Sequence, residues 1–148
     1  MLKLTDVSEK DDLSAEKQFD DIITLPYEAR QKSRLLSQTD KGTKIGIFLP
    51  RGQVLRRGLV LTGPDQYQVK VDAAPEAVSV VRTDDILQYA KACYHLGNRH
   101  VVLQILPGEL RYLSDHVLDN MLVGLGLTVM QEILSFEPEN GAYYNHGH

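Results

Sequence analysis

Residues 77–106 read AVSVVRTDDILQYAKACYHLGNRHVVLQIL, and they decide the fold of the C-terminal half. The β-branched run at 77–82 predicts a strand. Thr83 can cap a helix over roughly 84–96, where two leading aspartates suit the positive end of the helix dipole. A Gly-Asn pair then favours a helix stop, and the run at 100–106 predicts another strand. The stretch therefore predicts a strand–helix–strand unit.

A second unit follows a Pro-Gly turn. Residues 109–113 predict a strand, Ser114 or Asp115 can cap a second helix, Gly126 ends that helix, and 127–133 predicts a last strand. The order β-α-β-β-α-β is the ferredoxin-like arrangement. The faces expected to be buried carry Ile86, Ala90 and Cys93 in the first helix, and Val117, Leu118, Met121, Leu122 and Leu125 in the second.

The N-terminal half is predicted to be β-rich. Short candidate strands alternate with turns rich in Gly and Pro, which is typical of a small sandwich or barrel. Residues 1–20 have no clear period and are expected to form a loose lead-in or an edge strand. With a boundary at Pro75, we predict an α+β protein with an all-β domain over 1–74, a ferredoxin-like domain over 75–138 and a flexible tail over 139–148. The candidate strands are 22–25, 33–37, 44–49, 59–62 and 67–71.

The composition excludes several classes of protein. The 148 residues carry a formal net charge of -4, whereas nucleic-acid binders usually have a clearly basic surface. No apolar run approaches the roughly 18 residues of a membrane span, and the N-terminus lacks the apolar core of a secretory signal. The single cysteine, Cys93, excludes an internal disulfide framework. These features favour a cytoplasmic protein.

The sequence offers no recognisable catalytic set. It contains no glycine-rich phosphate loop, no C-x-x-C pair and no H-E-x-x-H motif. Cys93 falls on the predicted apolar face of its helix, so a buried structural thiol is favoured over a nucleophile. We therefore expect a protein that is not an enzyme.

The five histidines all lie in the C-terminal third of the chain. His95 and His100 would stand about 140° apart on a continuous helix and could not chelate one ion from it. Because the helix stops between them, His100 is expected at the start of a strand, placed by a turn and exposed. For both histidines an alternative to metal binding stays open. His100 could be an ordinary surface residue, and His95 could be a partly buried helix residue.

His116 and the tail histidines are further candidates. His116 is expected in the first turn of the second helix, where the dipole disfavours the charged ring and leaves the neutral ring available to a metal. His146 and His148 flank a glycine at the end of the chain, so they could swing over a site and close it. A tag remnant is the alternative reading of this tail. Imidazole ligands suit nickel, copper and zinc alike, so residue type alone does not choose the metal.

Several stretches together resemble the UreE family of urease accessory proteins, which carries nickel. The run His95-Leu-Gly-Asn-Arg-His100 is the most specific of them, and the resemblance extends from about Leu25 to the C-terminus. Some members of that family have a further histidine where this chain has Ser114. The resemblance therefore implies that His116 is only a weaker ligand here. The resembling stretches are 25–34, 47–52, 74–82, 92–100, 110–112, 115–119, 136–139 and 141–143.

The resemblance implies a nickel metallochaperone. It implies a homodimer in which His100 of both copies binds one Ni²⁺, with His146 and His148 as further ligands. It also implies delivery of the ion through the urease accessory GTPase to the urease apoprotein. Zn²⁺ or Cu²⁺ could occupy the same site, and a small zinc- or copper-binding protein of metal storage or hydrolysis is the rival interpretation.

Overall fold

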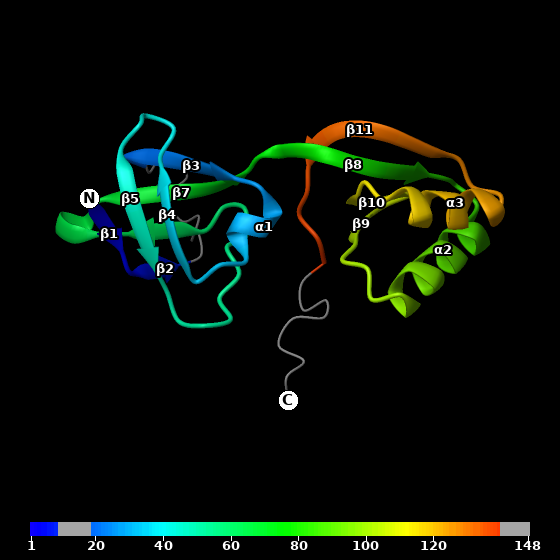
Figure 1. Ribbon diagram of the computed structural model, residues 1–148, viewed down its shortest axis with the longest axis horizontal. Coiled ribbons are helices and arrows are strands. Elements are labelled where there is room, and N and C mark those ends of the chain that lie inside the picture. Colours follow the sequence, from blue (N-terminus) through cyan, green and yellow to red (C-terminus); the bar gives the residue numbers. More distant parts are fainter. Residues whose placement is uncertain (9–18, 140–148) are drawn as a thin grey trace. The chain divides into compact units, whose positions relative to one another are not determined.

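The computed structural model describes residues 1–8 and 19–139, which form two compact units (Figure 1). The first unit is Met1–Ala74, and the second begins at Pro75. The first unit is β-rich and the second alternates strands with helices, so the predicted α+β class is confirmed. Within the described residues, no helix is long and apolar enough to cross a membrane.

The first unit contains two sheets that share one core. Ile23 and Val69 from one sheet and Ile45 and Ile47 from the other belong to the same buried cluster, as expected for a small sandwich. One sheet has the order β1 (Leu2–Leu4), β5 (Lys44–Phe48), β4 (Arg34–Gln38). The other has the order β2 (Asp6–Ser8), β6 (Val60–Thr62), β7 (Gln68–Ala73), β3 (Asp21–Leu25).

Of the two arrangements expected for the N-terminal segment, the structure has the edge strand. β1 and β2 each lie at the edge of a sheet, so residues 1–8 are not a loose lead-in. The one-turn helix α1 (Tyr27–Arg30) was not predicted, since a single turn is too short to show a helical period. A second short helix, η1, covers Pro64–Gln66.

The second unit has the predicted β-α-β-β-α-β order. Its sheet runs β11-β8-β10-β9 with all neighbours antiparallel, and this is the ferredoxin-like arrangement. The elements are β8 (Pro75–Arg82), α2 (Ile86–Asn98), β9 (Gln104–Leu106), β10 (Glu109–Leu113), α3 (His116–Gly124) and β11 (Val129–Ser135).

The buried face of α2 differs from the predicted one. The helix begins at Ile86, after Asp85 accepts hydrogen bonds from the backbone N–H groups of Leu87 (3.0 Å) and Gln88 (3.1 Å). Ile86 and Ala90 were expected to be buried, but Ile86 is 85% exposed and Ala90 is exposed. In α3, Val117 is likewise 53% exposed. The other predicted core residues, Cys93 in α2 and Leu118, Met121, Leu122 and Leu125 in and just after α3, do pack in the core of unit 2. Tyr89, Ala92 and Leu96 complete the face of α2 that meets the sheet.

The chain beyond β11 crosses the face of the sheet that the helices leave open. Ser135 at the end of β11 accepts a hydrogen bond from Arg111 of β10 (3.2 Å), and the backbone N–H of Glu137 donates to Gln104 of β9 (3.0 Å). Phe136 between them is fully buried. We call residues 136–139 the strap. It leads from one edge of the sheet to the other, as the orange-red trace in Figure 1 shows.

Candidate metal centre

His100 stands in a left-handed turn at the C-terminal end of α2. Its φ is +61°, and it is exposed. Its backbone N–H donates to the carbonyl of Gly97 (3.0 Å), and the N–H of Val101 donates to the carbonyl of Leu96 (3.1 Å). These two bonds make a Schellman motif, in which glycine usually takes the left-handed position.

This geometry corrects two sequence expectations. The helix includes Gly97 and Asn98, which were expected to follow its last residue, and Arg99 is its C-cap. His100 does not begin a strand either, because β9 is limited to Gln104–Leu106. The physical reason is the pair of Schellman hydrogen bonds. These bonds end the helix with His100 as the left-handed residue, three residues after Gly97. His100 nevertheless lies in a turn and is exposed, as predicted.

The left-handed conformation of His100 carries an energetic cost. For a residue with a Cβ it costs roughly 1 kcal/mol relative to glycine, although histidine tolerates it better than most residues do. Strained positions of this kind concentrate at functional sites. The strain therefore singles out His100 among the described histidines.

The other described candidates lie elsewhere in unit 2. His95 is half-buried in the last turn of α2, with its ring edge-on to Tyr94 at 5.2 Å between centroids. His116 is the exposed first residue of α3, as predicted, after Asp115 caps the helix through the N–H groups of Val117 and Leu118. His146 and His148 lie outside the described residues.

Cys93 is a poor ligand or nucleophile in this position. It is partly buried and packs against the core of unit 2. Burial raises the pKa of the Cys93 thiol, and this disfavours the thiolate that would bind a metal or attack a substrate. The predicted structural role is consistent with this environment.

One copy of the described chain does not gather a complete ligand set. Among residues 1–8 and 19–139, no group of three or more histidine, cysteine, aspartate or glutamate side chains could hold a metal ion. A site at His100 therefore requires ligands from the tail, from a second copy of the chain, or from both.

The outer face of α2, which leads to His100, is apolar. Ile86, Leu87, Ala90 and Tyr94 fall within an arc of roughly 100° on the helix. Ile86, Leu87 and Tyr94 are 85%, 63% and 68% exposed. We call these four residues the α2 stripe. Sequence reasoning found its helical period in Ile86 and Ala90 but assigned both to the core, because periodicity alone cannot tell a core from an interface.

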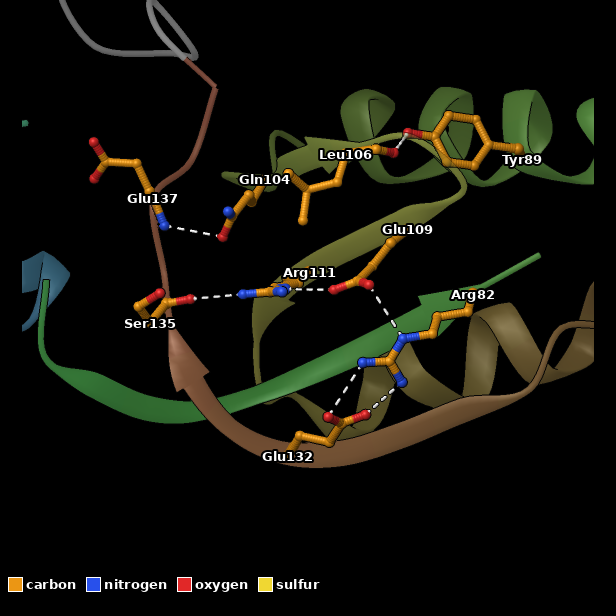
Figure 2. A network of polar contacts seen from close by, with 9 residues as sticks. All are labelled: Arg82, Tyr89, Gln104, Leu106, Glu109, Arg111, Glu132, Ser135 and Glu137. Carbon is orange, nitrogen blue, oxygen red and sulfur yellow. Dashed lines mark hydrogen bonds and ion pairs between the residues drawn. The ribbon is translucent and has the colours of Figure 1, made fainter. Parts of the chain in front are cut away.

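An ion-pair network ties the strands of the sheet together and reaches the end of β11, just before the strap (Figure 2). Arg82 bonds Glu132 on β11 (2.6 Å) and Glu109 on β10 (3.1 Å). The other carboxylate oxygen of Glu109 accepts from Arg111 (2.6 Å), which also donates to the Ser135 carbonyl (3.2 Å). Burial raises the pKa of Glu109, but the hydrogen bonds from Arg111 and Arg82 outweigh this and leave it lowered. The network thus fixes the side chain of Arg111 where it meets the chain leaving β11.

Comparison with known proteins covers both units. Residues 4–74 match the model of the N-terminal domain of the UreE urease accessory protein, and residues 76–148 match that of its C-terminal domain. The chain is 58% identical to the urease accessory protein UreE of Alkalilimnicola ehrlichii, over 84% of this chain and 76% of the relative. It is 54% identical to the proteins of the same name from Escherichia coli O157:H7, over 85% and 82%, and from Pseudomonas putida strain GB-1, over 85% and 78%. The chain therefore belongs to the UreE family of urease accessory proteins.

Proposed function

We propose that this protein is a nickel metallochaperone that delivers Ni²⁺ for assembly of the urease active site. The observation that carries the proposal is the exposed His100 in its left-handed turn at the end of α2. The family, whose relatives are named urease accessory proteins, supplies the context of urease maturation. The protein acts as a carrier and not as an enzyme.

The binding site is proposed to lie between two copies of the chain. A second copy covering the α2 stripe would remove an exposed apolar surface from water, which favours a homodimer. If the two-fold axis passes near the C-terminal end of α2, His100 from both copies faces one ion. This accounts for a metal site although the described part of one chain has no ligand cluster.

The tail is proposed to complete the coordination shell. His146 and His148 supply the additional imidazoles, and His116 is a separate and weaker site. A shell that is partly built from a terminal segment can open for loading and release, unlike the closed four-ligand shell of a structural metal site. We propose that the accessory GTPase and the urease apoprotein are the partners in that transfer.

Nickel titration of two variants tests the proposal. His100→Ala removes two ligands per dimer and should abolish the tightest site. Removal of residues 144–148 should leave an ion that binds more weakly and exchanges faster. Circular dichroism of both variants controls for folding. If His100→Ala binds nickel as tightly as the intact chain, the central site is elsewhere. If the truncation alone loses all binding, the tail is the primary site.

The rival function, a zinc- or copper-binding protein of storage or hydrolysis, makes a different prediction. Cu²⁺ is expected to bind imidazole sites more tightly than Ni²⁺ on intrinsic affinity, so affinity alone cannot decide between them. Transfer can decide. If the protein is a nickel carrier, its nickel-loaded form should activate urease apoprotein when mixed with the other accessory proteins, and if it is a zinc- or copper-binding protein, the nickel-loaded form should not.

A further inference from the structure

One of the two sheets in the first unit, Met1–Ala74, exposes a basic face. Its strands β1, β5 and β4 lie side by side, and successive side chains point alternately into the core and away from it (Figure 1). Leu4, Ile45 and Ile47 are fully buried on the core side. The strand register then assigns their neighbours to the other side. We call the following residues of that side the outer face: Lys3, Arg34, Leu36, Lys44, Gly46 and Phe48.

Phe48 stands on the middle strand, with a cation from each neighbouring strand beside its ring. Nζ of Lys3 and Cζ of Arg34 each lie 6.0 Å from the centroid of the ring. The ring also covers the backbone of Gly46, where a Cβ would come within 2.7 Å of the ring atom Cε2. Covering a glycine in a sheet is a structural role for an aromatic residue. That role does not account for two cations at the same ring.

The cations of the outer face have no acidic counterpart. The three strands carry Lys3, Arg34 and Lys44 but no aspartate or glutamate, and all three cations are exposed. Within residues 1–8 and 19–139 none of the three forms a salt bridge, whereas Arg57 of the same unit pairs with Asp72 at 2.9 Å. On a chain with a formal net charge of -4, this leaves a local positive patch that attracts anionic groups.

Apolar side chains are exposed among these cations. Leu36 lies opposite Gly46 on the edge strand β4 and is 69% exposed. The Phe48 ring is itself only partly buried. A single exposed leucine is ordinary on a protein surface. A leucine and an aromatic ring among unpaired cations, however, form a mixed surface that fits a ligand with both carboxylates and an apolar group.

We propose that the outer face binds an acidic segment of a partner protein, in which carboxylates flank an apolar side chain. The carboxylates meet Lys3, Arg34 and Lys44, and the apolar side chain covers Leu36 and Phe48. A protein segment is favoured over a nucleic acid because three cations are few for a polyanion and the face offers one ring for stacking. The inference goes beyond the proposed nickel site, whose histidines all belong to the second unit.

Binding of model peptides to the full chain tests the proposal. The probe is a short fluorescent peptide of alternating glutamate and leucine, and fluorescence anisotropy follows its binding. Lys3→Gln combined with Arg34→Gln should weaken binding roughly tenfold at low salt, because two charge contacts are lost. At about 1 M salt, where charges more than about 3 Å apart are screened, the difference should disappear. No binding by the intact chain, or equal binding by the variant at low salt, would overturn the proposal.

Arg57→Gln combined with Lys70→Gln is the matched control. It removes the same two kinds of cation from the same unit, but Lys70 lies on β7 of the other sheet and Arg57 bonds Asp72 of that strand. Peptide binding should be unchanged. A loss equal to that of the outer-face variant would mean that only the overall charge matters, and the proposal would fail. Circular dichroism checks that both variants are folded.

A mutant cycle between Leu36 and the peptide tests the apolar contact. Leu36→Ser should weaken binding of the glutamate–leucine peptide roughly three- to fivefold. It should leave binding of a glutamate–serine peptide unaffected, because that peptide has no apolar side chain to lose. An equal loss with both peptides would contradict the apolar contact. A lysine–leucine peptide should not bind, and its binding would contradict the need for carboxylates.

Two other anions distinguish the class of partner. Single-stranded DNA and vesicles that contain anionic lipid are titrated against the full chain under the same conditions. Both should bind more weakly than the glutamate–leucine peptide. If either binds more tightly than the peptide and is lost in the variant with Lys3→Gln and Arg34→Gln, the outer face belongs to that ligand and the proposal is overturned.

Discussion

The two helices of unit 2 end in the same hydrogen-bonded turn but with different residues. After α3, the N–H of Gly126 donates to the Val123 carbonyl (2.9 Å) and that of Leu127 to the Leu122 carbonyl (3.1 Å). After α2, the corresponding donors are His100 and Val101. Gly126 has a φ of +94°, and His100 one of +61°. One helix end uses the residue that the backbone prefers, and the other uses an imidazole.

The two turn positions are otherwise equivalent, so comparing them distinguishes what the backbone requires there from what the side chain adds. Both turns satisfy carbonyl groups at a helix end, and glycine does so without the strain that a Cβ introduces. The histidine therefore adds nothing to the helix stop that glycine would not provide. What it adds is an exposed imidazole at a fixed place, at the C-terminal end of the helix that carries the α2 stripe.

The largest expected effect comes from exchanging the two residues. In the double variant His100→Gly, Gly126→His the number of histidines is unchanged, but the imidazole moves from the end of α2 to the end of α3. Nickel affinity should fall roughly 100-fold or more, which corresponds to about 2.8 kcal/mol. Calorimetric titration measures this. Retained affinity would mean that the position at the end of α2 has no special role.

The next effect concerns Gly126 alone. Gly126→Ala places a Cβ in the left-handed conformation and 3.2 Å from Nε2 of the flexible Gln88 side chain. It should lower the free energy of unfolding of unit 2 by roughly 1–2 kcal/mol. Urea denaturation followed by NMR signals of unit 2 checks this, and nickel affinity should stay unchanged. An undiminished stability would show that the left-handed turn is not costly here.

A smaller difference is expected between two substitutions of His100. Both His100→Gly and His100→Ala remove the imidazole and should lose nickel equally. His100→Gly should be the more stable of the two by about 1 kcal/mol, because only alanine retains the strain of a Cβ at this φ. Thermal denaturation of the two variants side by side measures the difference. The reverse order would remove the argument from strain.

The smallest effect concerns the stability of the fold in acid, which the next prediction contrasts with metal binding in acid. Hydrogen bonds from Arg82 lower the pKa of Glu132 in the folded state. Its ion pair therefore stabilises the fold above the unfolded pKa of about 4.3 and is lost as pH falls through the lower folded value. Glu132→Gln should make the urea midpoint slightly lower at neutral pH and less sensitive to acid below about pH 4. Equal acid sensitivity of the variant and the intact chain would contradict this.

Nickel binding should weaken at a higher pH than folding does. Imidazole ligands must be neutral to bind a metal, so affinity should fall in mild acid while unit 2 is still folded. Titration at two pH values, with circular dichroism at each, distinguishes the two responses. A constant affinity over that range would argue against histidine ligands.

The sequence predicted the order of elements in unit 2 because each element has a clear period or cap. Asp115, for example, was named as a cap and accepts the N–H bonds of a cap. The end of α2 was placed wrongly, since Gly97 looked like the stop and nothing in the sequence marks His100 as left-handed. Ile86 was assigned to the core because apolar spacing does not reveal whether sheet or solvent lies opposite.

The sequence contains only a weak indication of the strap. Phe136 is an isolated aromatic residue in a polar segment, and its burial depends on the open face of a sheet formed by distant strands. The hydrogen bonds of Gln104 to Glu137 and of Arg111 to Ser135 are also long-range contacts that no local pattern indicates. The histidines were found from residue type, but the route of residues 136–139 across the sheet required the structure.

Native mass spectrometry of the nickel-loaded protein tests whether one ion is shared between two copies of the chain. We predict that the first Ni²⁺ appears on the dimer, with one ion per two chains. In His100→Gly the dimer should persist without that ion, because the α2 stripe is intact. An ion bound to single chains at first loading, or an unchanged ion on the His100→Gly dimer, would contradict a site shared between two copies of His100.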